Sequence, residues 1–225
     1  MLMASLRHLM LISIHIPKCA GTSFRHVLQH IYGDRLWLNY GGIFSRDQSH
    51  PGFVPAGIEC VHGHFFADAL DGLVADPKYI TWMRHPVERV VSNYFHFLRS
   101  PDDRDACCRA LREKHLTLRE FAELDWMRNE ATRYLATKSL ADFAFIGVAE
   151  RFADSLQVFA RLIGWEQPLP APWENTNPAR MARSYELTAS DFNYILALNG
   201  ADLAAYENVV VRLDSALQRQ TNRIA

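Results

Sequence analysis

A short segment near the N-terminus carries the residue types that bind phosphate. It follows an apolar stretch at 9–16 and precedes a segment with the apolar spacing of a helix. A helix N-terminus attracts anions through its unpaired N–H groups, while Gly21 lets the backbone approach closely and Lys18 adds a cation. The alternative is that Thr22 or Ser23 only caps the helix, with Lys18 solvated. In chain order the segment is Pro17, Lys18, Cys19, Ala20, Gly21, Thr22 and Ser23.

A second candidate phosphate site follows a later strand. Residues 78–83 are rich in aromatic and apolar types, and Arg84 comes directly after them. Pro86 stands where a helix begins, so Ser92 lies two turns into that helix. An arginine and a serine that converge here can hold a phosphate, because a guanidinium pairs with it in a bidentate manner. The alternative is an arginine that closes the end of the sheet and a serine on the helix surface.

Two histidines, His62 and His64, stand between these motifs and are separated by Gly63. A neutral imidazole, with an ordinary pKa of about 6.5, suits the role of general base at neutral pH. Residues i and i+2 of a strand share a face, so the pair could instead bind a metal, but no third ligand is evident. Both rings could also be bonded inside the end of a sheet. Because of the flanking motifs we favour a base, His64 first and His62 as assistant or alternative, and predict no metal.

These motifs need elements that bring them together. Strand-like apolar segments recur at 9–16, 58–61, 78–83 and 143–148, each followed by helical spacing. This alternation predicts an α/β sandwich with a mostly parallel sheet, whose ligands bind at the carboxyl ends of the strands. All three motifs stand at such ends. We expect a helix at 65–73, an exposed charged loop or lid at 100–115, and loops at 39–57 and 166–178.

The composition limits the possible functions. The 225 residues carry 24 Lys and Arg against 25 Asp and Glu, a net charge of −1. This balance argues against a bulk nucleic-acid or membrane-surface binder. No apolar run reaches the ~18 residues of a membrane span, and the run before Pro17 lacks the cleavage site of a signal peptide. Four cysteines without a CxxC pair argue against a disulfide scaffold or a zinc site and favour a reducing cytoplasm.

Two alternative functions are a P-loop kinase of a small metabolite and a non-catalytic nucleotide-binding module. The Walker A loop of such kinases has its lysine directly before Ser or Thr, whereas Lys18 precedes Gly21. The strand that ends at Met83 is followed by Arg84 rather than by a carboxylate for Mg²⁺. The module is disfavoured because the candidate catalytic and binding residues are all present.

Together the motifs resemble those of the sulfotransferases that use PAPS, 3′-phosphoadenosine 5′-phosphosulfate. The family's first pattern, P-K-x-x-G-[ST]-[ST], is matched over residues 17–23, and its second, R-x-P-x-x-R-x-x-S-x-Y, over residues 84–94. The His-Gly-His segment resembles that of the carbohydrate branch, in particular the heparan sulfate (uronyl) 2-O-sulfotransferases. The resemblance spans about residues 12–183. It implies a P-loop NTPase-like three-layer sandwich with a mostly parallel central sheet flanked by helices.

The resemblance also implies how PAPS binds as co-substrate, without a metal. The loop at 17–23 would hold the 5′-phosphosulfate, with Lys18 stabilising the leaving oxygen, and Arg84 and Ser92 would hold the 3′-phosphate. Cys19 stands where the family often has Thr, so one hydroxyl contact is expected to be lost. Residues expected to close over the nucleotide are Thr176 and Asn177.

The implied reaction is in-line transfer of a sulfuryl group to an acceptor hydroxyl, with His64 or His62 as base. The acceptor is expected to be a saccharide, with no nucleic acid and no membrane span; its binding residues and the oligomeric state stay open. We expect one sulfotransferase-like domain over residues 1–225, with a core at about 9–183 and C-terminal helices at 188–221. Because the sequence shows no membrane anchor or stem like those of Golgi enzymes, we expect a cytoplasmic enzyme of bacterial type.

Overall fold

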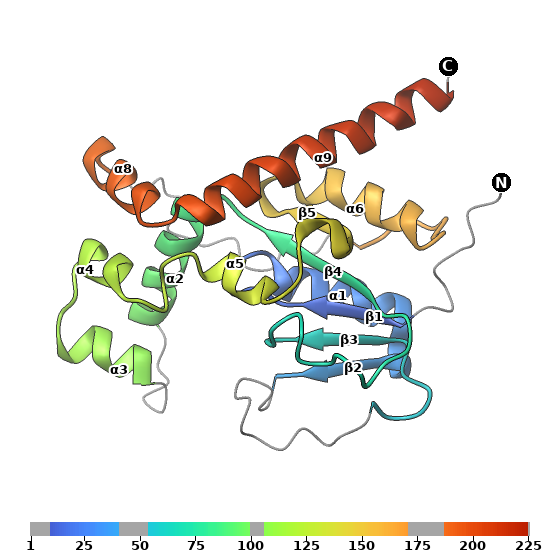
Figure 1. Ribbon diagram of the computed structural model, residues 1–225, viewed down its shortest axis with the longest axis horizontal. Coiled ribbons are helices and arrows are strands. Elements are labelled where there is room, and N and C mark those ends of the chain that lie inside the picture. The colour runs from blue at the N-terminus through green and yellow to red at the C-terminus, as the bar shows by residue number, and fades with distance from the viewer. Residues whose placement is uncertain (1–9, 41–53, 100–105, 171–186, 225) are drawn as a thin grey trace.

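A parallel β-sheet lies at the centre of the computed structural model, which describes residues 10–40, 54–99, 106–170 and 187–224 (Figure 1). The sheet has five strands in the order β2-β3-β1-β4-β5, and each neighbouring pair is parallel. The strands are β1 (Leu11–Ile14), β2 (Leu36–Asn39), β3 (Cys60–Gly63), β4 (Lys78–Met83) and β5 (Phe143–Val148). Helices flank the sheet, which confirms the predicted α/β class.

The helices connect the strands and extend the molecule beyond them. They are α1 (Gly21–Tyr32), α2 (Pro86–Arg99), α3 (Ala106–Glu113), α4 (Leu118–Glu123), α5 (Glu130–Leu135), α6 (Phe152–Leu162), α8 (Ala189–Ala197) and α9 (Gly200–Ile224). Short 3₁₀ turns are η2 (Gly33–Arg35), η3 (Leu140–Asp142) and η4 (Ala149–Arg151). The C-terminal helices predicted at 188–221 are therefore α8 and α9. In the part of the chain that the structure describes, no helix combines the length and apolarity needed to cross a bilayer.

The central strand β1 is buried along its whole length between β3 and β4. Three of its four residues are apolar, which is typical of a strand covered on both faces. Helices α1 and α6 cover one face, and α5 lies over the other (Figure 1). On the first face the ring of Phe24 lies 5.0 Å from Phe159 and 5.1 Å from Trp82, measured between centroids. These contacts fix α1, and with it the loop that precedes it, against the sheet.

One strand was missed from the sequence, and two expectations for local structure were wrong. No pattern predicted β2, because its four residues are mostly half-buried at the edge of the sheet. Residues 65–73 form successive turns with i to i−3 hydrogen bonds instead of a helix, as between Ala69 N–H and the Phe66 carbonyl at 2.9 Å. The expected loop or lid at 100–115 contains α3, where Cys108 and Leu111 are buried. These two residues are three positions apart and therefore share one face of that charged helix.

A second apolar core lies apart from the one around the sheet. It joins α2, α3, α4 and α8 through residues such as Val90, Leu111, Phe121 and Ile195. Helix α2 belongs to it and also follows directly after β4, so it links this helical layer to the sheet.

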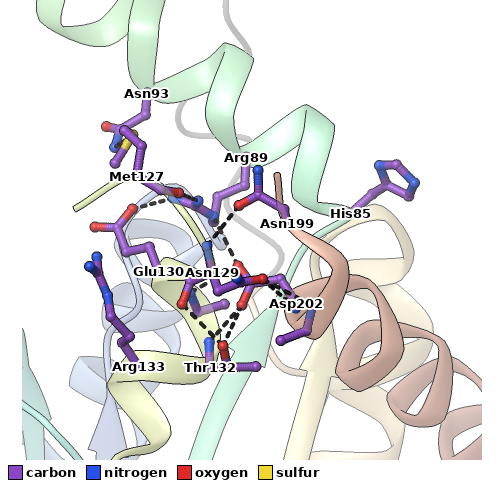
Figure 2. Close-up of polar contacts among 12 residues, drawn as sticks. His85, Arg89, Asn93, Met127, Asn129, Glu130, Thr132, Arg133, Asn199 and Asp202 are labelled. Atoms are coloured by element: carbon purple, nitrogen blue, oxygen red, sulfur yellow. Dashed lines mark hydrogen bonds and ion pairs between the residues drawn. The ribbon is translucent and has the colours of Figure 1, made fainter. Parts of the chain in front are cut away.

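A buried polar network holds α2 to α5 and α9 (Figure 2). Arg89 of α2 is fully buried and forms an ion pair with Glu130. Its Nη2 donates a 2.8 Å hydrogen bond to the Met127 carbonyl, and its Nε lies 3.8 Å from Asp202 Oδ2. A buried charge needs such partners to offset its loss of hydration. Arg89, which the second sequence motif includes, therefore fixes α2 from inside.

Candidate active site

The loop between β1 and α1 takes a shape that most residues avoid. Lys18 has φ 65° and Ala20 has φ 63°, both in the left-handed region, which is strained for residues other than glycine. Ala20, whose side chain makes no capping hydrogen bond, is the N-cap of α1. The helix is therefore not capped by Thr22 or Ser23, and its first turn contains no acidic residue. The backbone N–H groups and the positive end of the helix dipole both favour an anion here.

Arg84 reaches this loop from the end of β4. Its Nη1 donates a 3.3 Å hydrogen bond to the Lys18 carbonyl oxygen. The Lys18 side chain is partly buried, and this burial, together with the neighbouring Arg84 and Arg99, lowers its pKa to about 8. Cations held together in a partly buried place repel one another, and a bound anion would relieve the repulsion. The electrostatics of the loop therefore match a phosphate or sulfate ligand.

Two carboxylates already contact Arg84. Its Nη2 donates to Glu88 Oε2 at 3.2 Å, and its Nε lies 3.9 Å from Glu150 Oε1. Glu150 is itself held by the backbone N–H of His85 at 2.9 Å. The sequence did not predict the contact with Glu150, because Glu150 follows β5 and meets Arg84 only through the order of the strands. A phosphate on Arg84 would compete with these two carboxylates.

The other nucleotide-binding candidates differ in their surroundings. Ser92 lies on α2 and is partly exposed. The Cys19 side chain is fully buried, and burial raises the pKa of its thiol to about 12, so the side chain belongs to the core. Pro17 and Thr22 are half-buried in or next to the loop. Thr176 and Asn177 lie outside the described residues.

Four aromatic rings gather at the carboxyl ends of β1, β2 and β3. His15 follows β1, and its ring lies 4.1 Å from His64 at an interplanar angle of 28° and 5.2 Å from His62 at 16°. Tyr40 follows β2 and meets all three imidazoles edge-on, with centroids 5.0, 5.6 and 5.9 Å away. We call His15, Tyr40, His62 and His64 the histidine cluster. The sequence motifs missed His15 and Tyr40, although both stand at strand ends.

The histidine cluster adjoins the phosphate loop. A Cβ atom added to Gly21 would lie only 1.9 Å from Cδ2 of His15. Gly21 is therefore needed for the ring to fit against the start of α1, in addition to the predicted close approach of an anion.

His64 has the chemistry of a general base. Its Nδ1 donates a 2.7 Å hydrogen bond to the His15 carbonyl oxygen, which can only accept. The neutral ring consequently carries its lone pair on Nε2. Burial lowers the pKa of His64, so the ring is neutral at pH 7. A neutral imidazole with a defined tautomer can accept a proton from a hydroxyl.

His62 has a more interior position than His64. Its side chain is buried, and its Nδ1 lies 2.8 Å from Ser13 Oγ on the neighbouring strand β1. Burial, and then the charge that His64 would carry, lower its pKa to about 3. Its ring faces Phe24 of α1, edge to face. Among the described residues no three His, Cys, Asp or Glu side chains are grouped so that they could hold a metal ion.

A parallel sheet with a cationic loop at the carboxyl ends of its strands is typical of α/β proteins that bind phosphate-like groups. A family model described as the sulfotransferase family matches residues 3–207, and the chain belongs to that family. No curated protein sequence matches it. Its fold is similar to a crystal structure of a sulfotransferase from Alicyclobacillus acidocaldarius, with 17% identity, 88% of this chain and 98% of that chain covered, and a TM-score of 0.46. The fold is also similar to a crystal structure of the mouse sulfotransferase SULT7A1 complexed with PAP, with 15% identity and a TM-score of 0.46. The match covers 82% of this chain and 66% of that chain.

Proposed function

We propose that the protein transfers a sulfuryl group from PAPS to a hydroxyl of an acceptor, with His64 as the general base. The observation that carries the proposal is the hydrogen bond from His64 Nδ1 to the His15 carbonyl, which leaves the lone pair of a neutral ring on Nε2. Membership of the sulfotransferase family supports the reaction class.

The reaction is an in-line displacement at sulfur. The acceptor oxygen forms a new S–O bond while the bond between sulfur and the bridging oxygen of PAPS breaks. The proton of the acceptor hydroxyl passes to Nε2 of His64. The leaving group is PAP (adenosine 3′,5′-bisphosphate), and the negative charge develops on its 5′-phosphate. Lys18 would stabilise this charge, since its partly buried ammonium belongs to the loop itself.

The nucleotide would bind across the two phosphate motifs. The turn from Ala20 to Ser23 would take the 5′-phosphate on its N–H groups, and Arg84, with Ser92, would take the 3′-phosphate. Binding at Arg84 exchanges the carboxylates of Glu88 and Glu150 for a phosphate. A phosphate offers more charge and can accept two parallel hydrogen bonds, so it is the better partner for a guanidinium.

The acceptor and the domain organisation belong to the same proposal. The His-Gly-His segment supports a saccharide acceptor of the kind used by the uronyl branch. The sheet core and the C-terminal helices would act as one domain, since Arg89 of α2 lies 3.8 Å from Asp202 of α9.

The nucleotide site is tested by calorimetric titration with PAP, with ADP, and with ATP plus Mg²⁺. We expect PAP to bind much more tightly than ADP, because only PAP has a 3′-phosphate. A preference for ATP with Mg²⁺ would support a kinase instead, and no binding of any nucleotide would support a non-catalytic module.

The base is tested with His64→Ala in a transfer assay with PAPS and a panel of saccharide acceptors. We expect kcat to fall by about 100-fold or more, with the affinity for PAP retained. His30→Ala, at an exposed position on the far end of α1, is the matched control. Equal turnover of the His64→Ala and wild-type proteins would reject His64 as the base.

A further inference from the structure

The backbone and the ring of His15 both contact the candidate base. Its carbonyl oxygen accepts the 2.7 Å hydrogen bond from His64 Nδ1, and its imidazole stacks on the His64 imidazole at 4.1 Å. The carbonyl selects which nitrogen of His64 carries the proton. The stacked ring limits how far the His64 ring can turn about its own bonds.

The ring of His15 is itself held on three sides. Its Nδ1 lies 2.8 Å from the Tyr40 hydroxyl, and its other stacked neighbour is His62. On the third side it lies against Gly21, where any side chain would overlap it. His15 as a whole residue is only 7% exposed. A ring fixed in this way gives His64 a rigid surface rather than a movable one.

The position of His15 also joins two parts of the site. The residue lies between the end of β1 and the loop that begins at Pro17, and its ring lies against the first residue of α1. Tyr40 comes from the end of β2, on the far side of β3. The distance between the base and the phosphate loop is thus set through one imidazole that three segments of the chain hold.

We propose that His15, held in place by Tyr40, is a positioning residue that fixes the tautomer and the orientation of His64 for proton abstraction. The proposal rests on the proposed role of His64 as base. His15 takes no proton from the acceptor in this scheme: it acts only through His64. Misplacement of a reacting group by about 1 Å can lower a rate by about 100-fold, so such a residue affects kcat without contacting the acceptor.

Three variants distinguish the stacking of His15 on His64 from its hydrogen bond with Tyr40. His15→Asn keeps a polar atom near the position of Nδ1 for Tyr40 but removes the stacked ring. Tyr40→Phe keeps the aromatic edge and removes the hydroxyl that bonds to His15. His15→Ala removes both contacts of the side chain and retains only the backbone carbonyl. Tyr32→Phe, in a buried tyrosine of α1 that is not part of the histidine cluster, is the matched control.

The direct measurement is the tautomer of His64 by long-range ¹H–¹⁵N correlation NMR, which does not require any enzymatic activity. We expect the wild-type protein and Tyr32→Phe to show one tautomer with the proton on Nδ1. We expect His15→Asn and His15→Ala to show a mixture of tautomers, because the His64 ring, no longer stacked on an imidazole, can turn away from the retained His15 carbonyl. Tyr40→Phe should show a smaller change of the same kind. An unchanged single tautomer in both His15 variants would overturn the proposal.

The kinetic measurement uses PAPS with an accepted saccharide, and calorimetry with PAP. We expect His15→Asn to lower kcat by about 10- to 100-fold while the KM for PAPS and the Kd for PAP stay within about twofold of the wild-type values. Equal kcat in His15→Asn and wild type would overturn the positioning role even if His64→Ala is inactive. Full activity of His64→Ala would instead reject His64 as the base and, with it, the positioning role of His15, whereas loss of activity in His64→Ala with normal kcat in His15→Asn would reject the positioning role alone.

Discussion

Asn129 and Asp202 cap each other's helices. The Asp202 carboxylate accepts hydrogen bonds from the backbone N–H groups of Ala131 and Thr132, at 3.0 and 2.8 Å, at the start of α5. Asn129 Oδ1 in turn accepts from Ala201 and Asp202, at 3.0 and 3.2 Å, at the start of α9. The N-termini of the two helices thus meet, and a side chain from each accepts hydrogen bonds from the backbone N–H groups at the start of the other.

Arg89 adds a cation to this junction from α2 (Figure 2). It contacts Glu130 and lies near Asp202, so the three buried charges belong to three helices. Because α2 begins just after Arg84, this network also sets the position of the candidate 3′-phosphate site. The stability of the fold and the geometry of the site share these residues.

We expect Arg89→Ala to lower the free energy of unfolding by about 3–5 kcal/mol, because it leaves the Glu130 and Asp202 carboxylates buried without their cation. Urea denaturation measures the change. Arg35→Ala, which breaks an exposed ion pair with Glu59, is the control and should change it by less than about 1 kcal/mol. Similar losses in the two variants would contradict a structural role for the buried network.

Gly21→Ala should destabilise the protein by about 1–3 kcal/mol, because the added Cβ would lie 1.9 Å from the His15 ring. Gly200→Ala is a matched control, since Gly200 is likewise the first residue of a helix but has no atom within 4 Å of such a Cβ. Thermal unfolding of both variants checks the difference. If the two melting temperatures fall equally, the loss reflects the helix start and not the His15 ring.

Arg84→Lys should weaken PAP binding by about 10- to 100-fold, because an ammonium cannot form the two parallel hydrogen bonds of a guanidinium. Calorimetric titration with PAP gives the Kd. Arg151→Lys, in an arginine that pairs with Asp154 and Asp214, serves as the control and should bind PAP normally. An unchanged Kd in Arg84→Lys would place the 3′-phosphate elsewhere.

The histidine cluster should make the free energy of unfolding decrease as the pH falls. Burial lowers the pKa values of His15, His62 and His64 below the ordinary value of about 6.5. The nearby cations Arg25 and Lys18 act on His15 in the same direction. Below about pH 6.5 the unfolded chain therefore binds protons that the folded protein excludes. The contribution of these neutral histidines to stability is fully present above that pH. It is lost as the pH falls towards the pKa values of the folded protein; that value is about 3 for His62.

Each such histidine adds up to about 1.4 kcal/mol per pH unit to the slope of the unfolding free energy against pH in that window. His62→Asn, which keeps a polar atom for Ser13, should reduce the slope of unfolding free energy between pH 6.5 and 4 by up to this amount. Urea denaturation at several pH values, with His30→Asn as control, measures it. An identical slope in wild type and His62→Asn would mean that His62 is not buried in its neutral form.

The sequence alone was enough to predict the parallel α/β architecture and the places of three motifs. Short, mostly apolar runs between turn signals favour buried strands, and the residue after such a strand lies at the carboxyl edge of the sheet. For that reason Lys18, His62 and Arg84 could be assigned to one edge without coordinates. The functions proposed for them still depend on the experiments above.

Only the tertiary structure decided which side chains meet across that edge. His15 contacts Tyr40, which lies on the far side of β3, and Arg84 contacts Glu150 because β4 pairs with β5. Arg89 belongs to the sequence pattern that was predicted to bind phosphate, yet it is buried with Glu130 in the junction of three helices. Such contacts depend on strand order, register and helix packing between segments distant in the chain. No local pattern of residues records them, because the pattern fixes the face on which a residue lies but not its neighbour there.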